Sequence, residues 1–287
     1  MSQRFQHIAV LMGGTSAERA VSLSSGRGCA DALRQRYRVS EIDFTGDVPA
    51  LVATLRKPDA PEAVFNALHG HHGEDGTMQG LLDLLGVPYT HSGVRASATA
   101  IDKAATRTLF ELIGLRVPPG RVVSFNQAMT VFAPPFVVKP VAEGSSVGVL
   151  IVRDGDNRAQ PTDWRFGGQV LVEIYIPGRE LTCAVVDDSA GNAVALAPLE
   201  IRPRDAFYTY DSKYADGGSD HLIPAPIPQT IASEVRAAAL AAHQALGCRG
   251  VSRSDFRYDD AAVPGAPEGR LYILETNTQP GMTPTSL

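Results

Sequence analysis

Two acids and one amide near the end of the chain have the residue types and the spacing of a metal site. In this sequence of 287 residues, Asp255 lies in "SRSDF", and Glu275 and Asn277 lie in "ILETN". Both stretches read as neighbouring strands, and residues two positions apart on a strand point to the same face. Carboxylate and amide oxygens are ligands that magnesium prefers, with positions left open for phosphate oxygens. Solvated strand ends are the alternative, and the apolar "LYIL" before Glu275 favours the metal site.

A small polar loop between apolar strands has the composition of a phosphate site. The stretch "EGSSVG" begins at Glu143, contains Ser145 and Ser146, and follows "PFVVKP" with its Lys139. Successive N–H groups of a glycine-rich turn can bind phosphate, and two hydroxyls and a lysine can add donors and charge. The stretch does not match the P-loop pattern, and Gly/Ser tips between strands are common. The residues alone therefore leave a phosphate loop and a plain hairpin both open.

Two further segments have features of a nucleotide site. In "VLVEIYIPGRE", Glu173 ends an apolar strand, and the following backbone offers a donor and an acceptor to a flat heterocycle, with Glu180 close by. Taken alone, this pattern favours a simple strand–turn–strand. The long polar stretch "FYTYDSKYADGGSDHLIPAP" carries Lys213 and Tyr214 near its middle. Loops of this length in compact domains are typically functional lids or disordered, and the aromatic residues argue against plain disorder.

The C-terminal "ETNTQPGMTPTSL" and the histidine-rich "HGHHGEDG" are candidates for binding small polar substrates. Gly281 allows close approach of the backbone to a ligand, and Ser286 has a hydroxyl that can donate to a carboxylate. His69 and its two neighbouring histidines have no fourth ligand at a fixed spacing. A polar substrate loop is therefore the better interpretation of that stretch than a metal centre.

Composition excludes several other classes of protein. The net charge is −5 and no Lys/Arg run occurs, which argues against a nucleic-acid or basic membrane-surface partner. Cys29, Cys183 and Cys248 are widely spaced and form no Cys-x-x-Cys motif, so we expect buried thiols in a reducing compartment. No signal peptide is recognisable, and no apolar run approaches the roughly 18 residues of a membrane span. We therefore expect a cytoplasmic protein.

The order of the elements predicts three domains with α/β and α+β character. Residues 1–100 alternate strands with helices, which is typical of a parallel sheet flanked by helices. Residues 101–178 open with a helix, for which we expect Leu109, Leu112 and Ile113 to form the apolar face and Gly114 to cap the end. Residues 179–287 contain strands and one long helix. We expect the core face of that helix to consist of Ile231, Val235, Ala239, Ala242 and Leu246.

The order of the motifs along the whole chain resembles the D-alanine–D-alanine ligases, a family of ATP-grasp enzymes of peptidoglycan synthesis. The resemblance implies an ATP-grasp fold preceded by a Rossmann-like parallel-sheet domain. The stretch "GGTSAER" lacks G-x-G-x-x-G, which excludes a dinucleotide dehydrogenase. The motifs that carry the resemblance are "GGTSAERAVSLSSG", "ALHGHHGEDGTMQGLLDLLGVPYTHSG", "DK", "VVKPVAEGSSVGV", "VEIYIPGRELT", "FYTYDSKY", "GVSRSDF" and "ILETNTQPGMTPTSL".

The resemblance also implies a role for each matching residue. The nucleotide contacts would be Lys103, Lys139, Glu143, Ser146, Glu173, Ile174, Ile176, Glu180 and Lys213. The metal ligands would be Asp255, Glu275 and Asn277. The catalytic residues would be Glu18, Ser145 and Tyr214, which close the site, and Arg253 with the amide of Gly281, which form an oxyanion site. The substrate contacts would be His69, Ser286 and Leu287.

The implied reaction joins two D-alanine molecules at the expense of ATP, through a D-alanyl phosphate. The implied cofactors are two magnesium or manganese ions, with a monovalent cation as a further candidate, and the implied assembly is a homodimer. Tyr214 after Lys213 favours the dipeptide ligase over relatives that use D-lactate or D-serine as the second substrate. Arg253 and the metal ligands argue against a nucleotide-binding module without catalysis. The sequence stops at Leu287, where the family usually continues into a helical segment, so we expect such a segment to raise the melting temperature or lower the second substrate's KM.

Overall fold

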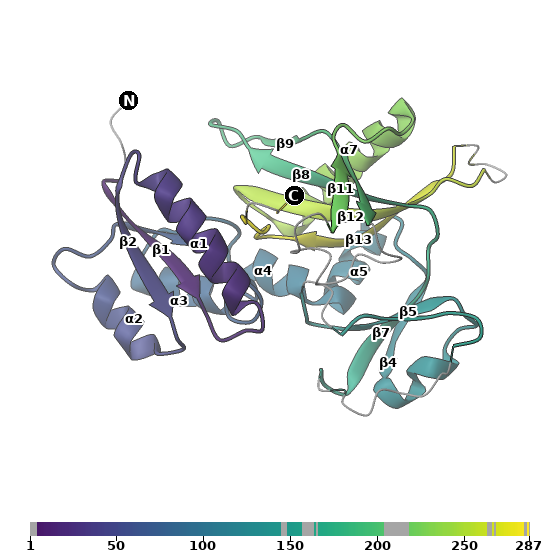
Figure 1. The fold of residues 1–287 in the computed structure, drawn as a ribbon, viewed down its shortest axis with the longest axis horizontal. Coiled ribbons are helices and arrows are strands. Elements are labelled where there is room, and N and C mark those ends of the chain that lie inside the picture. Colours follow the sequence, from purple (N-terminus) through teal and green to yellow (C-terminus); the bar gives the residue numbers. More distant parts are fainter. Residues whose placement is uncertain are drawn as a thin grey trace. The chain divides into compact units, whose positions relative to one another are not determined.

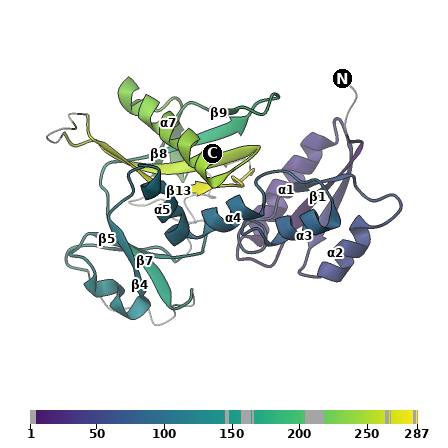
Figure 2. The same cartoon turned by 180° about the vertical axis from the view of Figure 1, so that it is seen from behind.

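The chain forms two compact units. The computed structural model describes residues 5–144, 148–156, 164, 166–203, 218–262, 266, 268–283 and 286. The first unit comprises Met1–Ala98, Cys248–Val251 and Thr278–Leu287, and the second comprises Thr99–Gly247 and Ser252–Asn277. Figure 1 shows the elements of both units, and Figure 2 shows them from behind.

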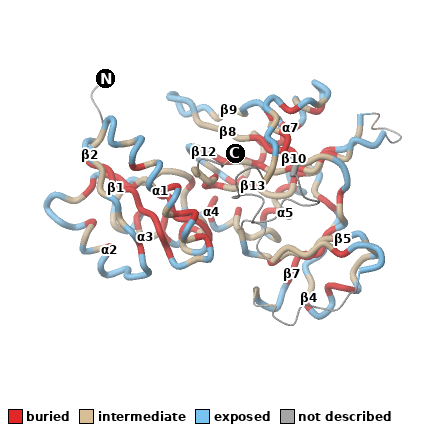
Figure 3. Tube along the Cα trace, in the orientation of Figure 1, coloured by how far each residue is buried: buried red, intermediate tan, exposed pale blue. Residues whose placement is uncertain are grey.

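The first unit is built on a parallel sheet, as the sequence predicts. The central strand β1 (His7–Gly13) pairs in parallel with β2 (Arg38–Phe44) and with β3 (Ala63–Asn66). All seven residues of β1 are buried, and Figure 3 shows the buried residues concentrated along this strand. A strand buried on both faces needs helices on both, which is what alternation of strands and helices provides.

Four helices accompany this sheet: α1 (Arg19–Leu33), α2 (Val48–Leu55), α3 (Thr77–Leu85) and α4 (Val94–Ile101). Alternate residues of β1 face different helices: Ala9 and Leu11 share a core with α2 and α3, whereas Val10 and Met12 share one with α1. Local signals set the helix ends. The side chain of Asp47 accepts a hydrogen bond from the N–H of Ala50 at the start of α2.

The second unit contains two sheets. The first is antiparallel, with strand order β4 (Gly120–Ser124), β7 (Gln169–Ile174), β5 (Phe136–Pro140) and β6 (Leu150–Val152). A 3₁₀ helix, η1 (Phe125–Thr130), packs against it through a core that includes Phe125, Phe136 and Val172.

The second sheet of this unit carries the acidic strands. Its order is β11 (Ser219–Leu222), β10 (Leu199–Pro203), β8 (Arg179–Asp187), β12 (Val251–Asp259) and β13 (Arg270–Asn277), and β9 (Ala193–Ala195) also pairs with β8, at residues 185–187. Two helices belong to it: α7 (Gln229–Leu246) contacts β8, β9 and β13, and α5 (Lys103–Leu112) contacts β13 and α7. The five residues predicted for the core face of α7 are all buried.

The apolar face expected for the first helix of the second unit is wrong. In α5 the buried side chains are Thr106 and Phe110, whereas Leu112 is 82% exposed and Ile113 is 40% exposed. Residues four apart share a helix face, so Thr106 and Phe110 bury together, and the last residues of the helix fall outside the contact. Gly114 follows the helix with a φ of 81°, as expected of a C-terminal glycine.

Two expectations about the whole chain can be compared with the structure. Cys29, Cys183 and Cys248 are free thiols; Cys183 is buried as predicted, whereas Cys29 and Cys248 are only partly buried, so the prediction of buried thiols is wrong for these two. Among the described residues, no helix has both the length and the apolarity needed to cross a membrane.

Candidate functional site

The three predicted metal ligands lie together on one strand pair of the second unit. In the antiparallel pairing of β12 with β13, Asp255 lies opposite Glu275, and Arg253 lies opposite Asn277. Residues directly opposite each other share a face of the sheet, and the buried Ser254 and Thr276 between them point to the other face. The alternation of strand residues therefore brings Asp255, Glu275 and Asn277 to the same face.

The carboxylates of Asp255 and Glu275 each lie beside a positively charged side chain. The guanidinium of Arg253 donates from Nε to Oδ1 and from Nη2 to Oδ2 of Asp255, each at 2.9 Å. The hydroxyl of Thr182 donates to the same Oδ1 at 2.6 Å. The ammonium of Lys103 lies 3.6 Å from Oε2 of Glu275. Each carboxylate thus has a positively charged partner, and carboxylate oxygens are the ligands that a hard divalent cation prefers.

The donor set fits magnesium by its chemistry. It contains two carboxylates and an amide oxygen, and all three residues are partly exposed rather than sealed in the core. Within the described part of the chain, no group of three or more His, Cys, Asp or Glu residues gathers as a soft or all-acid metal site. A pair of carboxylates plus an amide is typical of magnesium sites that share the ion with substrate phosphates.

The second predicted lysine belongs to a buried ion network. Glu173 is 3% exposed, and its carboxylate accepts from Lys139 Nζ at 2.7 Å and from Arg107 Nη1 at 3.1 Å. Burial lowers the pKa of Lys139, but the charges of Glu173 and Glu275 outweigh burial and raise that pKa above its ordinary value. Lys139 is therefore charged. The Glu275 carboxylate that raises its pKa is the same one that Lys103 approaches.

Lys103 also contacts the start of the predicted phosphate loop. Its ammonium donates to the backbone carbonyl of Glu143, and its backbone N–H donates to the carbonyl of Val141 at 2.9 Å. The second unit thus gathers two lysines, two acids and the base of a glycine-rich loop. This combination of positive donors and metal ligands can bind a polyphosphate together with its metal ions.

The segment proposed for the adenine runs from the end of β7 to the start of β8. The N–H of Ile174 donates to Pro119 O at 2.9 Å, and that of Tyr175 donates to Pro135 O at 3.2 Å. The side chain of Ile176 is buried, whereas that of Ile174 is 37% exposed. Glu180 lies at the start of β8, with its carboxylate 3.6 Å from Arg257.

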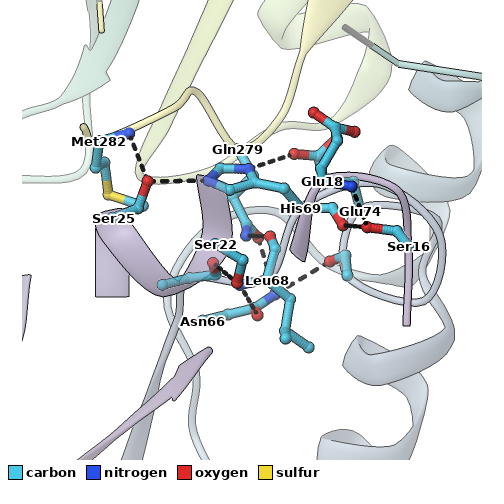
Figure 4. Close-up of polar contacts among 12 residues, drawn as sticks. Ser16, Glu18, Ser22, Ser25, Asn66, Leu68, His69, Glu74, Gln279 and Met282 are labelled. Atoms are coloured by element: carbon cyan, nitrogen blue, oxygen red, sulfur yellow. Dashed lines mark hydrogen bonds and ion pairs between the residues drawn. The ribbon is translucent and has the colours of Figure 1, made fainter. Parts of the chain in front are cut away.

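A buried polar cluster in the first unit surrounds His69 (Figure 4). Its Nδ1 lies 2.9 Å from Glu74 Oε1, and its Nε2 lies 3.3 Å from Ser25 Oγ. A carboxylate only accepts, so Nδ1 carries the proton. The hydroxyl of Ser16 donates to His69 O at 2.7 Å and accepts from the N–H of Glu18 at 3.2 Å. Glu18 and His69, both predicted near the first substrate, therefore belong to one cluster.

The ionisation of His69 is set by its carboxylate neighbours. Burial lowers the pKa of His69, but the hydrogen bond and charge of Glu74, together with the charge of Glu18, raise it above the ordinary value. The ring therefore keeps a second proton to higher pH than a free histidine does. In that form Nε2 donates to Ser25 Oγ.

The C-terminal segment packs into the same cluster. The side chain of Asn66 donates to Gln279 Oε1 at 2.8 Å, Gln279 Nε2 donates to Leu68 O, and the N–H of Met282 donates to Ser25 Oγ at 3.4 Å (Figure 4). A Cβ at position 281 would lie 2.8 Å from Ser286 Oγ, so any larger residue there would have to displace that hydroxyl. The predicted pair Gly281 and Ser286 therefore lie side by side.

Several side chains of these clusters were not predicted from the sequence. Arg107 sits in a helix whose pattern gives no sign that its guanidinium reaches Glu173. Asn66 carries a usable signal, since it is a polar residue at the carboxyl end of a parallel strand, where α/β sheets place ligands, whereas Gln279 carries no comparable signal.

Five predicted site residues are not placed. Ser145, Ser146, Lys213, Tyr214 and Leu287 lie outside the described residues. Of the three residues predicted to close the site, Glu18, Ser145 and Tyr214, only Glu18 lies among the described residues. Arg253 and Gly281 belong to different units, so their joint oxyanion role stays a prediction.

Comparison with known proteins agrees with this geometry. Two family models match, one described as "D-ala D-ala ligase N-terminus" over residues 49–92 and one as "D-ala D-ala ligase C-terminus" over residues 120–287. The chain is 53% identical to a D-alanine–D-alanine ligase of Methylobacterium radiotolerans, over 98% of this chain and 91% of that protein. It is 54% identical to one of Granulibacter bethesdensis, over 98% of this chain and 90% of that protein.

A solved structure gives the same result at the level of the fold. The ATP complex of D-alanine–D-alanine ligase from Bacillus anthracis superposes with a TM-score of 0.77 at 30% identity, over 99% of this chain and 90% of that chain. The chain thus has the fold of the ATP-grasp ligases, preceded by a Rossmann-like parallel-sheet domain. Within that class, it belongs to the D-alanine–D-alanine ligase family.

Removing the buried carboxylate of Glu173 should destabilise the protein strongly. Glu173→Gln leaves Lys139 and Arg107 without their shared counter-charge in a site where the glutamate side chain is 5% exposed. Breaking a buried pair by removing one partner costs about 3 to 5 kcal/mol, and we expect that loss in the free energy of unfolding by urea.

Glu111→Gln is the matched control, because Glu111 contacts the same Arg107 at 2.8 Å but is 52% exposed. An exposed pair contributes about 0 to 1 kcal/mol. Equal losses in the two variants would contradict the role of the buried network.

Two buried histidines should give stability opposite dependences on pH. Burial, followed by the charges of His69 and Arg249, lowers the pKa of His91 to about 4, despite a hydrogen bond with the backbone of Asn66. Between about pH 6.5 and pH 4 the unfolded chain binds a proton at His91 that the folded chain does not, so stability falls as pH falls. Asparagine tolerates the φ of 69° at this position. His91→Asn should therefore reduce the fall in the free energy of unfolding between about pH 6.5 and pH 4 by about 3 kcal/mol.

His69 has the opposite sign. Its pKa is raised, so its contribution is fully present below about pH 6.5 and is lost as pH rises through the raised pKa. His69→Asn should therefore cost more stability at pH 6 than at pH 9, measured by urea unfolding. A cost that grows with pH would show that the ring is neutral in the folded protein.

Proposed function

We propose that this protein uses ATP to join two D-alanine molecules into D-alanyl-D-alanine, through a D-alanyl phosphate, for peptidoglycan precursors. The observation that carries the proposal is the gathering of Lys103, Lys139, Asp255 and Glu275 in the second unit of a chain of this family. A carboxylate is a poor acyl donor, and such a site supplies what activating it with ATP requires.

The first step is phosphoryl transfer. A carboxylate oxygen of the first D-alanine attacks the γ-phosphorus, and the bond to the β,γ-bridging oxygen breaks, so that ADP leaves. Lys103 and Lys139 neutralise the phosphate oxygens, and Asp255, Glu275 and Asn277 hold two magnesium or manganese ions. When bound, the ions neutralise the charge on the transferring phosphate. Phosphoryl transfer needs chiefly such positioning and charge neutralisation.

The remaining nucleotide contacts come from three segments. Ile174 and Ile176 contact the adenine, and Glu180 accepts from the ribose hydroxyls. The carboxylate of Glu173 is already engaged by two cations, so its nucleotide contact is through the backbone. The loop that begins at Glu143 covers the phosphates with Ser146, and Lys213 reaches the γ-phosphate.

The second step forms the peptide bond. The neutral amine of the second D-alanine attacks the acyl carbon, the nitrogen gives up one proton to the departing phosphate or to solvent, and the C–O bond breaks so that phosphate leaves with the bridging oxygen. Arg253 and the amide of Gly281 stabilise the developing oxyanion, and Ser286 with Leu287 holds the carboxylate of the second substrate. Arg253 donates to Asp255 in the structure, and both lie on the same face of β12, so the guanidinium that donates to the oxyanion would lie next to the carboxylate that would hold a metal ion.

The first substrate lies near Glu18 and His69. Glu18, Ser145 and Tyr214 close the site and exclude water, which would otherwise hydrolyse the acyl phosphate. His69 carries positive charge there more readily than an ordinary histidine, because its pKa is raised against burial by Glu74 and Glu18. Positive charge suits a substrate that enters as a carboxylate.

Further expectations remain part of this proposal. They are a homodimer, a cytoplasmic location, a monovalent cation beside the two divalent ions, and domains at residues 1–100, 101–178 and 179–287. A ligase that uses D-lactate or D-serine as second substrate is the alternative, and relatives above 50% identity named as D-alanine–D-alanine ligases do not favour it.

Glu275→Gln tests the metal assignment. We expect ADP release in the presence of D-alanine and magnesium to fall at least about 1,000-fold, since an amide cannot neutralise the metal charge. The fold should remain nearly intact, because Glu275 lies on a partly exposed face. A coupled assay for ADP gives the rate, and circular dichroism reports the fold.

Asp259→Asn is the control, since Asp259 lies on the same strand as Asp255 and is bonded only weakly to the N–H of Ala261, at 3.3 Å. It should keep the rate of the unchanged protein. Normal ADP release by Glu275→Gln would remove Glu275 from the metal site.

A further inference from the structure

Arg257 contacts three residues of the segment that precedes and opens β8. Its Nε donates to Ile176 O at 3.1 Å, and its Nη2 donates to Gly178 O at 2.9 Å. Its Nη1 lies 3.6 Å from Oε2 of Glu180. The side chain of Arg257 is 17% exposed, so these contacts are largely shielded from water.

The backbone of the same segment lies directly against β12. Gly178 has a φ of 90°, and a Cβ there would lie 2.1 Å from Tyr258 O, which no side chain can accommodate. Arg257 also reaches Tyr175, with Nη2 3.4 Å from the hydroxyl and Cζ 5.6 Å from the ring centroid. Residues 175–180 are therefore fixed to β12 by one glycine and one arginine.

We propose that Arg257 is a positioning residue for ATP, which holds the adenine-binding backbone and the ribose-binding carboxylate in place before the nucleotide arrives. The inference rests on the proposed function, because it takes Ile176 and Glu180 as the nucleotide contacts. Donation from a charged group to two carbonyls is stronger than between neutral groups. A segment already ordered in this way loses less entropy when it binds a ligand.

The ion pair with Glu180 adds selectivity for the sugar. Glu180 accepts hydrogen bonds from ribose hydroxyls well only if its carboxylate points at them. Arg257 supplies the positive charge on one side of that carboxylate, at 3.6 Å. Discrimination between ribose and deoxyribose nucleotides should therefore depend on Arg257, although Arg257 contacts no sugar atom itself.

One face of strand β12 thus carries three residues with proposed functional roles. Its buried residues Ser252, Ser254, Phe256 and Tyr258 alternate with the partly exposed Arg253, Asp255 and Arg257. A strand presents every second residue to one face. In the order of the sequence, this face therefore carries the oxyanion donor, the metal ligand and the anchor of the adenine-binding segment.

Arg257→Met tests the proposal, because it keeps the length of the side chain and removes the guanidinium. We expect the Kd of a non-hydrolysable ATP analogue, measured by calorimetry, and the KM for ATP to rise about tenfold, as for the loss of charge-assisted hydrogen bonds. The KM for D-alanine and the kcat should change less than about twofold. Arg257→Lys keeps a charge near Glu180 but cannot serve two carbonyls, so we expect a rise of about threefold.

Sugar selectivity provides the second measurement. The ratio of kcat/KM for ATP to that for 2′-deoxy-ATP or 3′-deoxy-ATP should fall at least about threefold in Arg257→Met, since the carboxylate of Glu180 is no longer held. Arg116→Met is the matched control: Arg116 also donates to a strand carbonyl, Leu271 O at 3.3 Å, and lies 5.8 Å from a tyrosine ring. It should leave Kd and the ratio unchanged.

Three results separate this inference from its alternatives. Unchanged analogue affinity and sugar selectivity in Arg257→Met would overturn it while leaving the ligase function in place. A fall in kcat, a rise in the KM for both ATP and D-alanine, and a lower melting temperature would together show that Arg257 only stabilises the fold. That result would also overturn the inference. Failure of the unsubstituted protein to release ADP with D-alanine would instead overturn the proposed function.

Discussion

The charge pairing of buried and half-buried carboxylates organises the second unit. Moving an unpaired carboxylate out of water costs several kcal/mol, so each one needs a cation and hydrogen-bond donors. Glu173 has Lys139 and Arg107, and Glu200, with a side chain 5% exposed, has Arg179 and Arg202. Burial would raise the pKa of Glu200, but those two arginines lower it below its usual range.

The same pairing prepares the site for its ligands. Asp255 pairs with Arg253, and Glu275 lies near Lys103. Phosphates and metal ions carry the complementary charges, so each protein ion pair can exchange for a pair between protein and ligand. In the proposed complex, one set of compensated charges would replace another. This arrangement limits the cost of assembling a site that contains two acids and two lysines.

The first unit has to position a C-terminal segment that follows the second unit in the sequence. Residues after Thr278 contribute to a cluster that is otherwise built from the loops after β1 and β3. Gln279 and Met282 find partners there in Asn66, Leu68 and Ser25. Buried polar groups need specific partners, so this cluster fixes where the C-terminal segment lies. Gly281 and Ser286 gain their positions as a result.

Much of the fold and part of the site could be predicted from the sequence. The parallel sheet followed from alternation of strands and helices, and the common face of Glu275 and Asn277 followed from the period of a strand, whereas the register that adds Asp255 to that face came from the structure. Both depend on local geometry. Arg107 and Arg257 could not be predicted in this way, because each reaches a segment more than 65 residues away in the chain, as the contacts with Glu173 and Ile176 show. The face of α5 failed for a related reason, since tertiary packing decided that Phe110 rather than Leu112 is buried.

The central claim is that a D-alanyl phosphate connects ATP hydrolysis to peptide-bond formation. The most direct measurement follows the oxygen atoms of D-alanine labelled with ¹⁸O in its carboxylate, incubated with ATP, magnesium and the protein, with products analysed by mass spectrometry. The account predicts one ¹⁸O atom in each inorganic phosphate released per D-alanyl-D-alanine formed, since phosphate leaves with the former carboxylate oxygen. Dipeptide formation with unlabelled phosphate, or ADP release that does not depend on D-alanine, would contradict it.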